Sequence, residues 1–130
     1  MSKTIFLHLT DLHITAPTLE EPGVLSDTRG TLEQVKTLIS SLPEEPAFIL
    51  VSGDLTNKGD TVSFVTLKKM MADIETPIFY ALGNHDTRKG YYEGFLDAEA
   101  SDAYVDYEAT IAGLHLIVLD TSRTSAIGGF

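Results

Sequence analysis

Three short apolar runs, separated by helical patterns, organise the first two-thirds of the chain. The runs over 4–9, 47–51 and 78–82 are rich in apolar residues that favour strands, which is typical of buried strands. Between them, apolar residues at helical spacing predict one helix over 27–42 and a second that begins after Asp60 as its N-cap. Because strand and helix alternate, the pattern predicts βαβ units and a parallel sheet, which places the chain in the α/β class.

Each predicted helix carries an apolar stripe that we expect to be buried. The stripes consist of Leu32, Val35, Ile39 and Leu42 in the first helix and Phe64, Leu67, Met71 and Ile74 in the second. Further along the chain, the pattern predicts a short helix over 91–96. It also predicts a β-hairpin, formed by 103–111 and 114–119, that turns at Ala112 and Gly113.

Polar residues follow each of the three predicted strands directly. Asp11 and His13 follow the first, Asp54 follows the second, and the run Gly83-Asn84-His85-Asp86 follows the third. Each pattern alone is also typical of an ordinary turn. The carboxyl ends of parallel strands, however, meet at one edge of the sheet, so we expect the three groups to lie together in space. Their joint occurrence favours a functional site.

The residue types at these positions are those of a metal site. Carboxylate and amide oxygens together with imidazole nitrogen, and no thiolate, suit Mn, Fe, Zn or Ni. A carboxylate such as that of Asp54 has two oxygens and is able to bridge two ions. We expect His85 and Asp86 to pair as an imidazole oriented by a carboxylate. Glycines at 53 and 83 allow the backbone to turn sharply beside these ligands.

Composition narrows the classes of function. The 130 residues include 19 Asp and Glu against 9 Lys and Arg, a net charge of −10, which disfavours nucleic-acid binding driven by overall charge. Bound metal ions would reverse the local field for a small phosphate substrate. The chain has no cysteine, which excludes a thiol nucleophile and disulfides. No apolar run reaches the ~18 residues of a membrane span. We therefore expect one cytoplasmic domain over 1–130.

The three polar groups resemble the first three motifs of the calcineurin-like metallophosphoesterases. These motifs are Asp11-x-His13, Gly53-Asp54-x-x-Asn57 and Gly83-Asn84-His85-Asp86; segments 7–13 and 119–122 further resemble the bacterial class III cyclic-nucleotide phosphodiesterases. The resemblance implies a sandwich of β-sheets flanked by helices, with two divalent metal ions at one end.

The resemblance also implies a role for each matching residue. By it, Asp11 and His13 bind the first metal, Asp54 bridges both metals, and Asn84 binds the second. His85 then acts as the acid near the leaving group, and Asp86 orients it. The implied reaction is hydrolysis of a phosphoester by a hydroxide that the two metals activate.

The chain departs from the family pattern after the third motif. The family also supplies a later metal-binding histidine and a closing Gly-His-x-His motif, neither of which is present in these 130 residues. We expect neither His8 nor His115 to replace them as a ligand. The resemblance therefore leads us to expect the N-terminal portion of a metallophosphoesterase domain, incomplete at its C-terminus, and weak activity of this portion alone.

Three functions remain open at this point. The first is a phosphodiesterase that acts on a small phosphodiester such as a cyclic nucleotide. The second is a catalytically silent or binding-only domain, and the third is a nuclease of the same family, which the acidic balance disfavours. We expect no membrane partner, and a homo-oligomer is possible through uncovered sheet surface. Lys58, Arg88 and Lys89 lie near the site loops, where we expect solvated charges.

Overall fold

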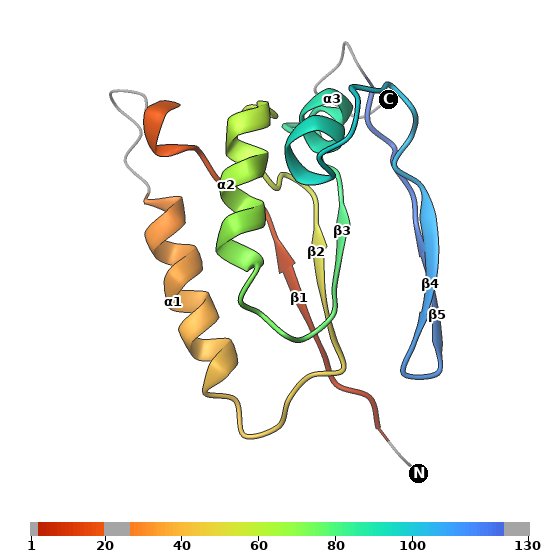
Figure 1. Cartoon of the computed structure of the whole chain (residues 1–130). Helices are drawn as coiled ribbons and strands as arrows, with labels where there is room; N and C mark the ends of the chain where they lie inside the picture. Colours follow the sequence, from red (N-terminus) through yellow and green to blue (C-terminus); the bar gives the residue numbers. More distant parts are fainter. Residues whose placement is uncertain (1–2, 20–26, 124–130) are drawn as a thin grey trace.

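The computed structural model describes residues 3–19 and 27–123 (Figure 1). Three parallel strands form a sheet in the order β1-β2-β3, and the two connections between them contain helices α1 and α2. These elements are β1 (Phe6–Thr10), α1 (Thr28–Ser40), β2 (Phe48–Ser52), α2 (Thr61–Met71) and β3 (Ile78–Ala81). The predicted α/β class and parallel sheet are confirmed.

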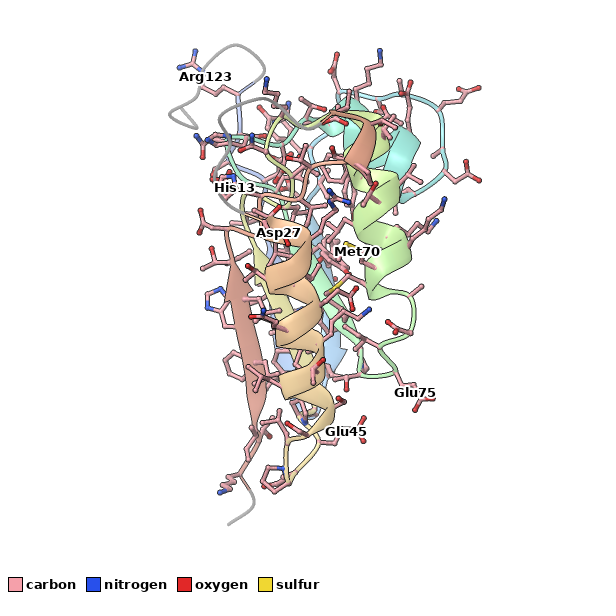
Figure 2. All side chains as sticks on the ribbon, turned by 90° about the vertical axis from the view of Figure 1, so that its left-hand side faces the viewer. His13, Asp27, Glu45, Met70, Glu75 and Arg123 are labelled. Carbon is pink, nitrogen blue, oxygen red and sulfur yellow. The ribbon has the colours of Figure 1, made fainter. Side chains whose placement is uncertain are left out.

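The main core lies between the sheet and α2. Phe64 and Leu67 of α2 are fully buried, and they pack with Ile49 and Val51 of the central strand. Figure 2 shows the two ends of this layer: His13 lies beyond the carboxyl end of β1, whereas Glu45 and Glu75 lie near the opposite end of the sheet. The core thus holds three strand ends side by side at the end where the polar loops begin.

Both long helices begin at an aspartate cap. The carboxylate of Asp27 accepts from the amide of Gly30 (2.9 Å), and that of Asp60 accepts from the amide of Ser63 (2.8 Å). Such caps satisfy amides that the first helical turn leaves without a partner. The predicted start of the second helix is therefore confirmed.

The predicted stripe of α1 is buried only in part. Leu32 is 2% exposed, but Val35 and Ile39 are half-buried, and Leu42 lies beyond the end of the helix and is 40% exposed. In Figure 1, α1 lies on the outer side of α2. Because the sheet is small and α1 lies at its edge, few residues are available to pack against the apolar stripe of α1. The apolar spacing alone therefore predicted more burial than the structure shows.

The remaining elements follow β3 or lie in the loop after β1. They are the 3₁₀ turn η1 (Pro17–Leu19), the short helix α3 (Arg88–Gly90), the π-helical turn η2 (Tyr91–Phe95), and the strands β4 (Tyr107–Ile111) and β5 (Leu114–Val118). The hairpin turns where predicted, since Ala112 and Gly113 have φ of 52° and 79°, the two positive values of a type I′ turn. Among the described residues, no helix is long and apolar enough to cross a membrane.

A single tyrosine connects the hairpin to the outer edge of the three-stranded sheet. The amide of Tyr80 on β3 donates to the hydroxyl of Tyr107 on β4 (2.8 Å), and that hydroxyl donates to the carbonyl of Tyr80 (2.5 Å). Burial raises the pKa of Tyr107, so the hydroxyl keeps its proton. One side chain therefore satisfies both backbone groups of an edge residue.

We predict that Tyr107→Phe destabilises the protein by about 1–3 kcal/mol, because it leaves a buried amide without its acceptor. Urea unfolding, followed by circular dichroism, measures the loss. Tyr92→Phe is the matched control, since the Tyr92 hydroxyl donates to the carbonyl of Ala103 (3.2 Å) at an exposed position where water replaces it. Equal stability of the two variants would show that Tyr107 does not anchor the hairpin.

Candidate metal centre at the carboxyl edge of the sheet

The loops after β1 and β2 are joined by backbone hydrogen bonds that continue the pairing of the two strands. The amide of Asp11 donates to the carbonyl of Gly53 (3.1 Å), and the amide of His13 donates to the carbonyl of Asp54 (2.9 Å). The next residues of the two loops are bonded in the same way (3.0 Å). The loops therefore leave the sheet as one unit.

Three residues of this unit have a left-handed backbone. The φ values are 58° at Asp11, 48° at His13 and 50° at Asp54. Non-glycine residues rarely adopt this region, at a cost of about 1–3 kcal/mol each, and such residues gather at functional sites. The hydrogen bonds between the loops hold these residues in place, and the left-handed turns direct three side chains to one point.

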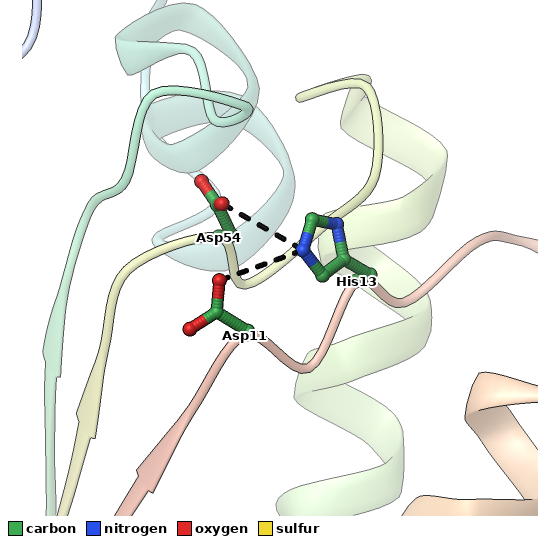
Figure 3. A group of neighbouring side chains, drawn as sticks. All are labelled: Asp11, His13 and Asp54. Carbon is green, nitrogen blue, oxygen red and sulfur yellow. Dashed lines mark ion pairs between the residues drawn. The ribbon is translucent and has the colours of Figure 1, made fainter. Parts of the chain in front are cut away.

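Asp11, His13 and Asp54 form a compact cluster at that point (Figure 3). Nε2 of His13 lies 3.6 Å from Oδ1 of Asp11 and 3.6 Å from Oδ2 of Asp54, and the ligand atoms all lie within 4.8 Å of one another. The predicted convergence of these three residues is confirmed. Two carboxylates and an imidazole around one point fit a divalent transition metal.

The Thr10 hydroxyl orients the carboxylate of Asp11. It lies 2.5 Å from Oδ2 of Asp11 and 2.7 Å from the carbonyl of Ser52, which turns the other oxygen, Oδ1, toward His13. The hydrogen bond from Thr10 is the main cause that lowers the pKa of Asp11. Thr10 therefore favours the ionised carboxylate, which is the form that binds a metal.

Asn57 contacts both histidines of the site. Its Oδ1 lies 3.2 Å from Nδ1 of His13, and its carbonyl oxygen lies 2.8 Å from Nδ1 of His85. Because both oxygens are acceptors, each Nδ1 carries the proton and donates it. The Nε2 of His13 then presents its lone pair toward the two carboxylates. The two rings meet edge to face, with centroids 4.9 Å apart.

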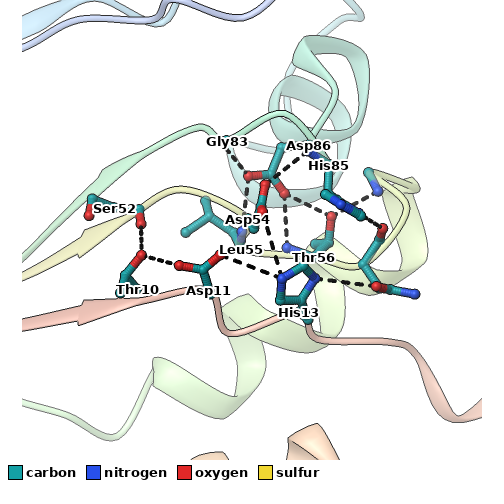
Figure 4. Close-up of polar contacts among 12 residues, drawn as sticks. Thr10, Asp11, His13, Ser52, Asp54, Leu55, Thr56, Gly83, His85 and Asp86 are labelled. Atoms are coloured by element: carbon teal, nitrogen blue, oxygen red, sulfur yellow. Dashed lines mark hydrogen bonds and ion pairs between the residues drawn. The ribbon is translucent and has the colours of Figure 1, made fainter. Parts of the chain in front are cut away.

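Asp86 does not orient His85, which corrects the expectation from the sequence. The buried carboxylate of Asp86 accepts from the amides of Leu55 (2.9 Å), Thr56 (2.8 Å) and Gly83 (2.9 Å), and from the Thr56 hydroxyl (2.9 Å) (Figure 4). Burial raises the pKa of Asp86, although these bonds oppose it. Asp86 instead fastens the loop after β3 to the loop after β2.

Glycine at position 83 allows these two loops to touch. A Cβ there would lie 2.0 Å from the amide nitrogen of Asp54 and 2.3 Å from its Oδ1. The loop after β3 also bonds to Asp54 directly, because the amide of His85 donates to the same Oδ1 (2.9 Å). Asn84 lies between these two contacts with an exposed side chain. Its role as a ligand remains a prediction.

The other two histidines lie away from the cluster. Nε2 of His8, on the exposed side of β1, lies 2.5 Å from the hydroxyl of Ser52. His115 is exposed on the hairpin, where its Nε2 pairs with Glu108 (2.8 Å). Within the described part of the chain, neither histidine belongs to the group of three that converges on the candidate ion.

The sequence did not reveal the two supporting residues of the site. Thr10 precedes Asp11 directly, but a threonine at the end of a strand carries no signal of its own. Asn57 is part of the motif Gly53-Asp54-x-x-Asn57, which does not show what its side chain contacts. Its two contacts span 44 and 28 positions, so no local pattern could have indicated them.

Comparison with known proteins matches residues 5–128 to the calcineurin-like phosphoesterase family. A probable cyclic nucleotide phosphodiesterase of Rhodococcus erythropolis is 32% identical over 124 residues, which cover 92% of this chain and 40% of that protein. A cAMP/cGMP dual specificity phosphodiesterase of Mycobacterium tuberculosis is 29% identical, over 91% of this chain and 38% of that protein.

A glycerophosphodiester phosphodiesterase of Enterobacter lignolyticus is similar over a shorter stretch. It is 25% identical over 68% of this chain and 32% of its own length. The chain thus spans about two-fifths or less of the length of these relatives.

We predict that Thr10→Val weakens the binding of Mn²⁺ by ~10–100-fold, the range typical of a lost outer-shell hydrogen bond. Valine keeps the shape and removes the donor to Asp11 Oδ2. Isothermal titration with Mn²⁺ measures the change. Thr10→Ser, which keeps the hydroxyl, should bind as the wild type does; a loss as large as that of valine would mean that packing of the methyl group matters instead.

Proposed function

The chain belongs to the calcineurin-like phosphoesterase family, and on this premise we propose that the protein is a metal-dependent phosphodiesterase whose preferred substrate is a cyclic nucleotide. The observation that carries the proposal is the convergence of Asp11, His13 and Asp54 on one point, with the imidazole of His85 beside it. The named relatives that act on cyclic nucleotides support the choice of substrate.

Four residues would hold the metal ions. Asp11 and His13 would hold the first ion, Asp54 would be shared by both ions, and Asn84 would hold the second. The chemistry of the donor set, oxygen and imidazole nitrogen without sulfur, fits Mn, Fe, Zn or Ni. When bound, the ions would supply Lewis-acid activation of water and compensation of the phosphate charge.

His85 supplies the proton that the leaving group needs. In the reaction, the oxygen of water bonds to phosphorus, one ester P–O bond breaks, and the proton of the attacking water passes to solvent. The departing alkoxide is strongly basic and takes a proton from a positioned acid. Since Nδ1 of His85 keeps its proton in the bond to the carbonyl of Asn57, the proton passed to the alkoxide is the second one of the imidazolium form, on Nε2. Solvent then restores the proton to His85.

A linear phosphodiester is the second candidate substrate. The similarity to a glycerophosphodiester phosphodiesterase favours it, and both substrate types release an alkoxide. The residues that would select between them lie outside Asp11, His13, Asp54 and His85, because these groups act only on the phosphate and the leaving oxygen. A cytoplasmic location stays a prediction of the sequence.

We predict that the protein hydrolyses a 3′,5′-cyclic nucleotide in excess Mn²⁺ and that a chelator abolishes the reaction. Release of the linear nucleotide, followed by chromatography, is the measurement, with a glycerophosphodiester assayed in parallel. His13→Ala should remove activity by losing a ligand. His115→Asn is the matched control, because His115 lies exposed on the hairpin. Hydrolysis that survives the chelator would reject the metal-dependent mechanism.

We predict that Asp54→Ala harms the binding of Mn²⁺ more than Asn84→Ala does. Asp54 carries charge to both ions, whereas Asn84 is one neutral ligand, so the loss at Asp54 should exceed the ~10–100-fold of an outer-shell change. Calorimetric titration of both variants, with circular dichroism to verify folding, makes the comparison. Equal losses would remove the bridging role from Asp54.

A further inference from the structure

Arg88 is buried, although the sequence led us to expect a solvated charge there. It is 8% exposed, and its Nε donates to Oδ2 of Asp120 (2.8 Å). Its Nη2 donates to the carbonyl of Ser122 (2.7 Å), and its Cζ lies 4.1 Å from the centre of the Tyr104 ring. Because the guanidinium is buried and bonded to Asp120 and Ser122, Arg88 does not face solvent as a phosphate-binding group would.

Asp120 joins Arg88 to both ends of the β4–β5 hairpin. Besides Arg88, its carboxylate accepts from the amide of Val105 (3.0 Å), before β4, and from the amide (2.9 Å) and hydroxyl (2.5 Å) of Ser122, after β5. Burial acts to raise the pKa of Asp120, but the hydrogen bonds from Arg88 and Ser122 outweigh it and lower the pKa to about 2. The pair is therefore fully charged at neutral pH.

The segment that presents His85 is held from two sides. On one side, Asp86 accepts from the loop after β2, and the hydroxyl of Thr87 donates to the carbonyl of Gly59 (2.5 Å). On the other side, Arg88 fastens the segment to Asp120. The imidazole of His85 is itself exposed, and one side-chain hydrogen bond, from Nδ1 to Asn57, orients it. Its orientation therefore depends on where these anchors hold the backbone.

We propose that Arg88 is a positioning residue for His85: its buried pair with Asp120 fixes the loop that presents the imidazole and so sets its aim at the leaving oxygen. This inference rests on the proposed function. A buried guanidinium that bonds to a carboxylate and a carbonyl at the same time is held in one orientation. A single hydrogen bond would leave it free to rotate. Through Asp120, the hairpin thereby helps to hold the segment that presents His85.

If Arg88 positions His85, the effect of an Arg88 substitution on kcat depends on the leaving group of the substrate. A cyclic nucleotide releases an alkoxide, which needs the proton from His85, whereas bis(p-nitrophenyl) phosphate releases a phenolate that departs without one. A misplaced imidazole therefore slows the first reaction and spares the second. A loss of general stability would slow both reactions equally, because it lowers the amount of active protein for either substrate.

The test compares Arg88→Gln and Asp120→Asn with Lys89→Gln, which removes a neighbouring exposed cation. For Arg88→Gln and Asp120→Asn we expect kcat on the cyclic nucleotide to fall by ~10–100-fold at unchanged KM, while kcat on bis(p-nitrophenyl) phosphate stays within about twofold. Lys89→Gln should match the wild type on both substrates. If Arg88→Gln does not fold, Arg88→Lys replaces it, since lysine keeps the charge and loses the fork.

An NMR measurement tests the role of Arg88 independently of whether the proposed function is correct. In ¹⁵N-histidine NMR spectra recorded at alkaline pH, where an imidazole carries one proton, wild-type His85 should carry it on Nδ1, and the Arg88 and Asp120 variants should show a mixture of the Nδ1–H and Nε2–H tautomers. Equal loss on both substrates, no loss on either, or an unchanged tautomer would overturn the role of Arg88. If the wild type hydrolyses neither substrate, the proposed function fails, and the tautomer alone decides whether Arg88 positions His85.

Discussion

The buried carboxylate of Asp86 is the interaction on which the rest of the site depends. Removing an ionised carboxylate from water is costly, and it is tolerated only when hydrogen bonds replace the lost solvation. Four donors from Leu55, Thr56 and Gly83 do so, and each bond to a charged group contributes roughly 1.5–3 kcal/mol. Since the donors belong to two loops, satisfying this one group brings the ends of β2 and β3 together.

The same edge of the sheet concentrates negative charge at a point that a cation would neutralise. Asp11 and Asp54 approach each other across a left-handed backbone, an arrangement that costs free energy through both backbone strain and repulsion between the carboxylates. The hydrogen bonds between the two loops hold these residues in place. A divalent ion between the two carboxylates would convert the repulsion into attraction.

The hairpin is coupled to this edge by contacts of two kinds. Tyr107 satisfies the backbone of β3 midway along the strand, and Arg88 ties the loop after β3 to Asp120, which contacts both ends of the hairpin. The first contact covers a strand edge that would otherwise offer unpaired groups to other chains. The second is a buried ion pair, for which loss of one partner leaves an uncompensated charge. Both link segments that are far apart in sequence.

The sequence by itself determined the elements and the place of the site. The strands, the second helix and the hairpin were predictable because their signals are local in sequence. These signals are the spacing of apolar residues, the aspartate cap of the second helix and the turn at Ala112 and Gly113. The parallel order then brings Asp11, His13 and Asp54 to one edge by geometry alone. Only the tertiary structure decided which partner each polar group takes. Asp86 binds backbone amides about 30 positions away instead of orienting His85, and Arg88 is buried against Asp120, because hydrogen-bond partners across such separations depend on packing that no local pattern records.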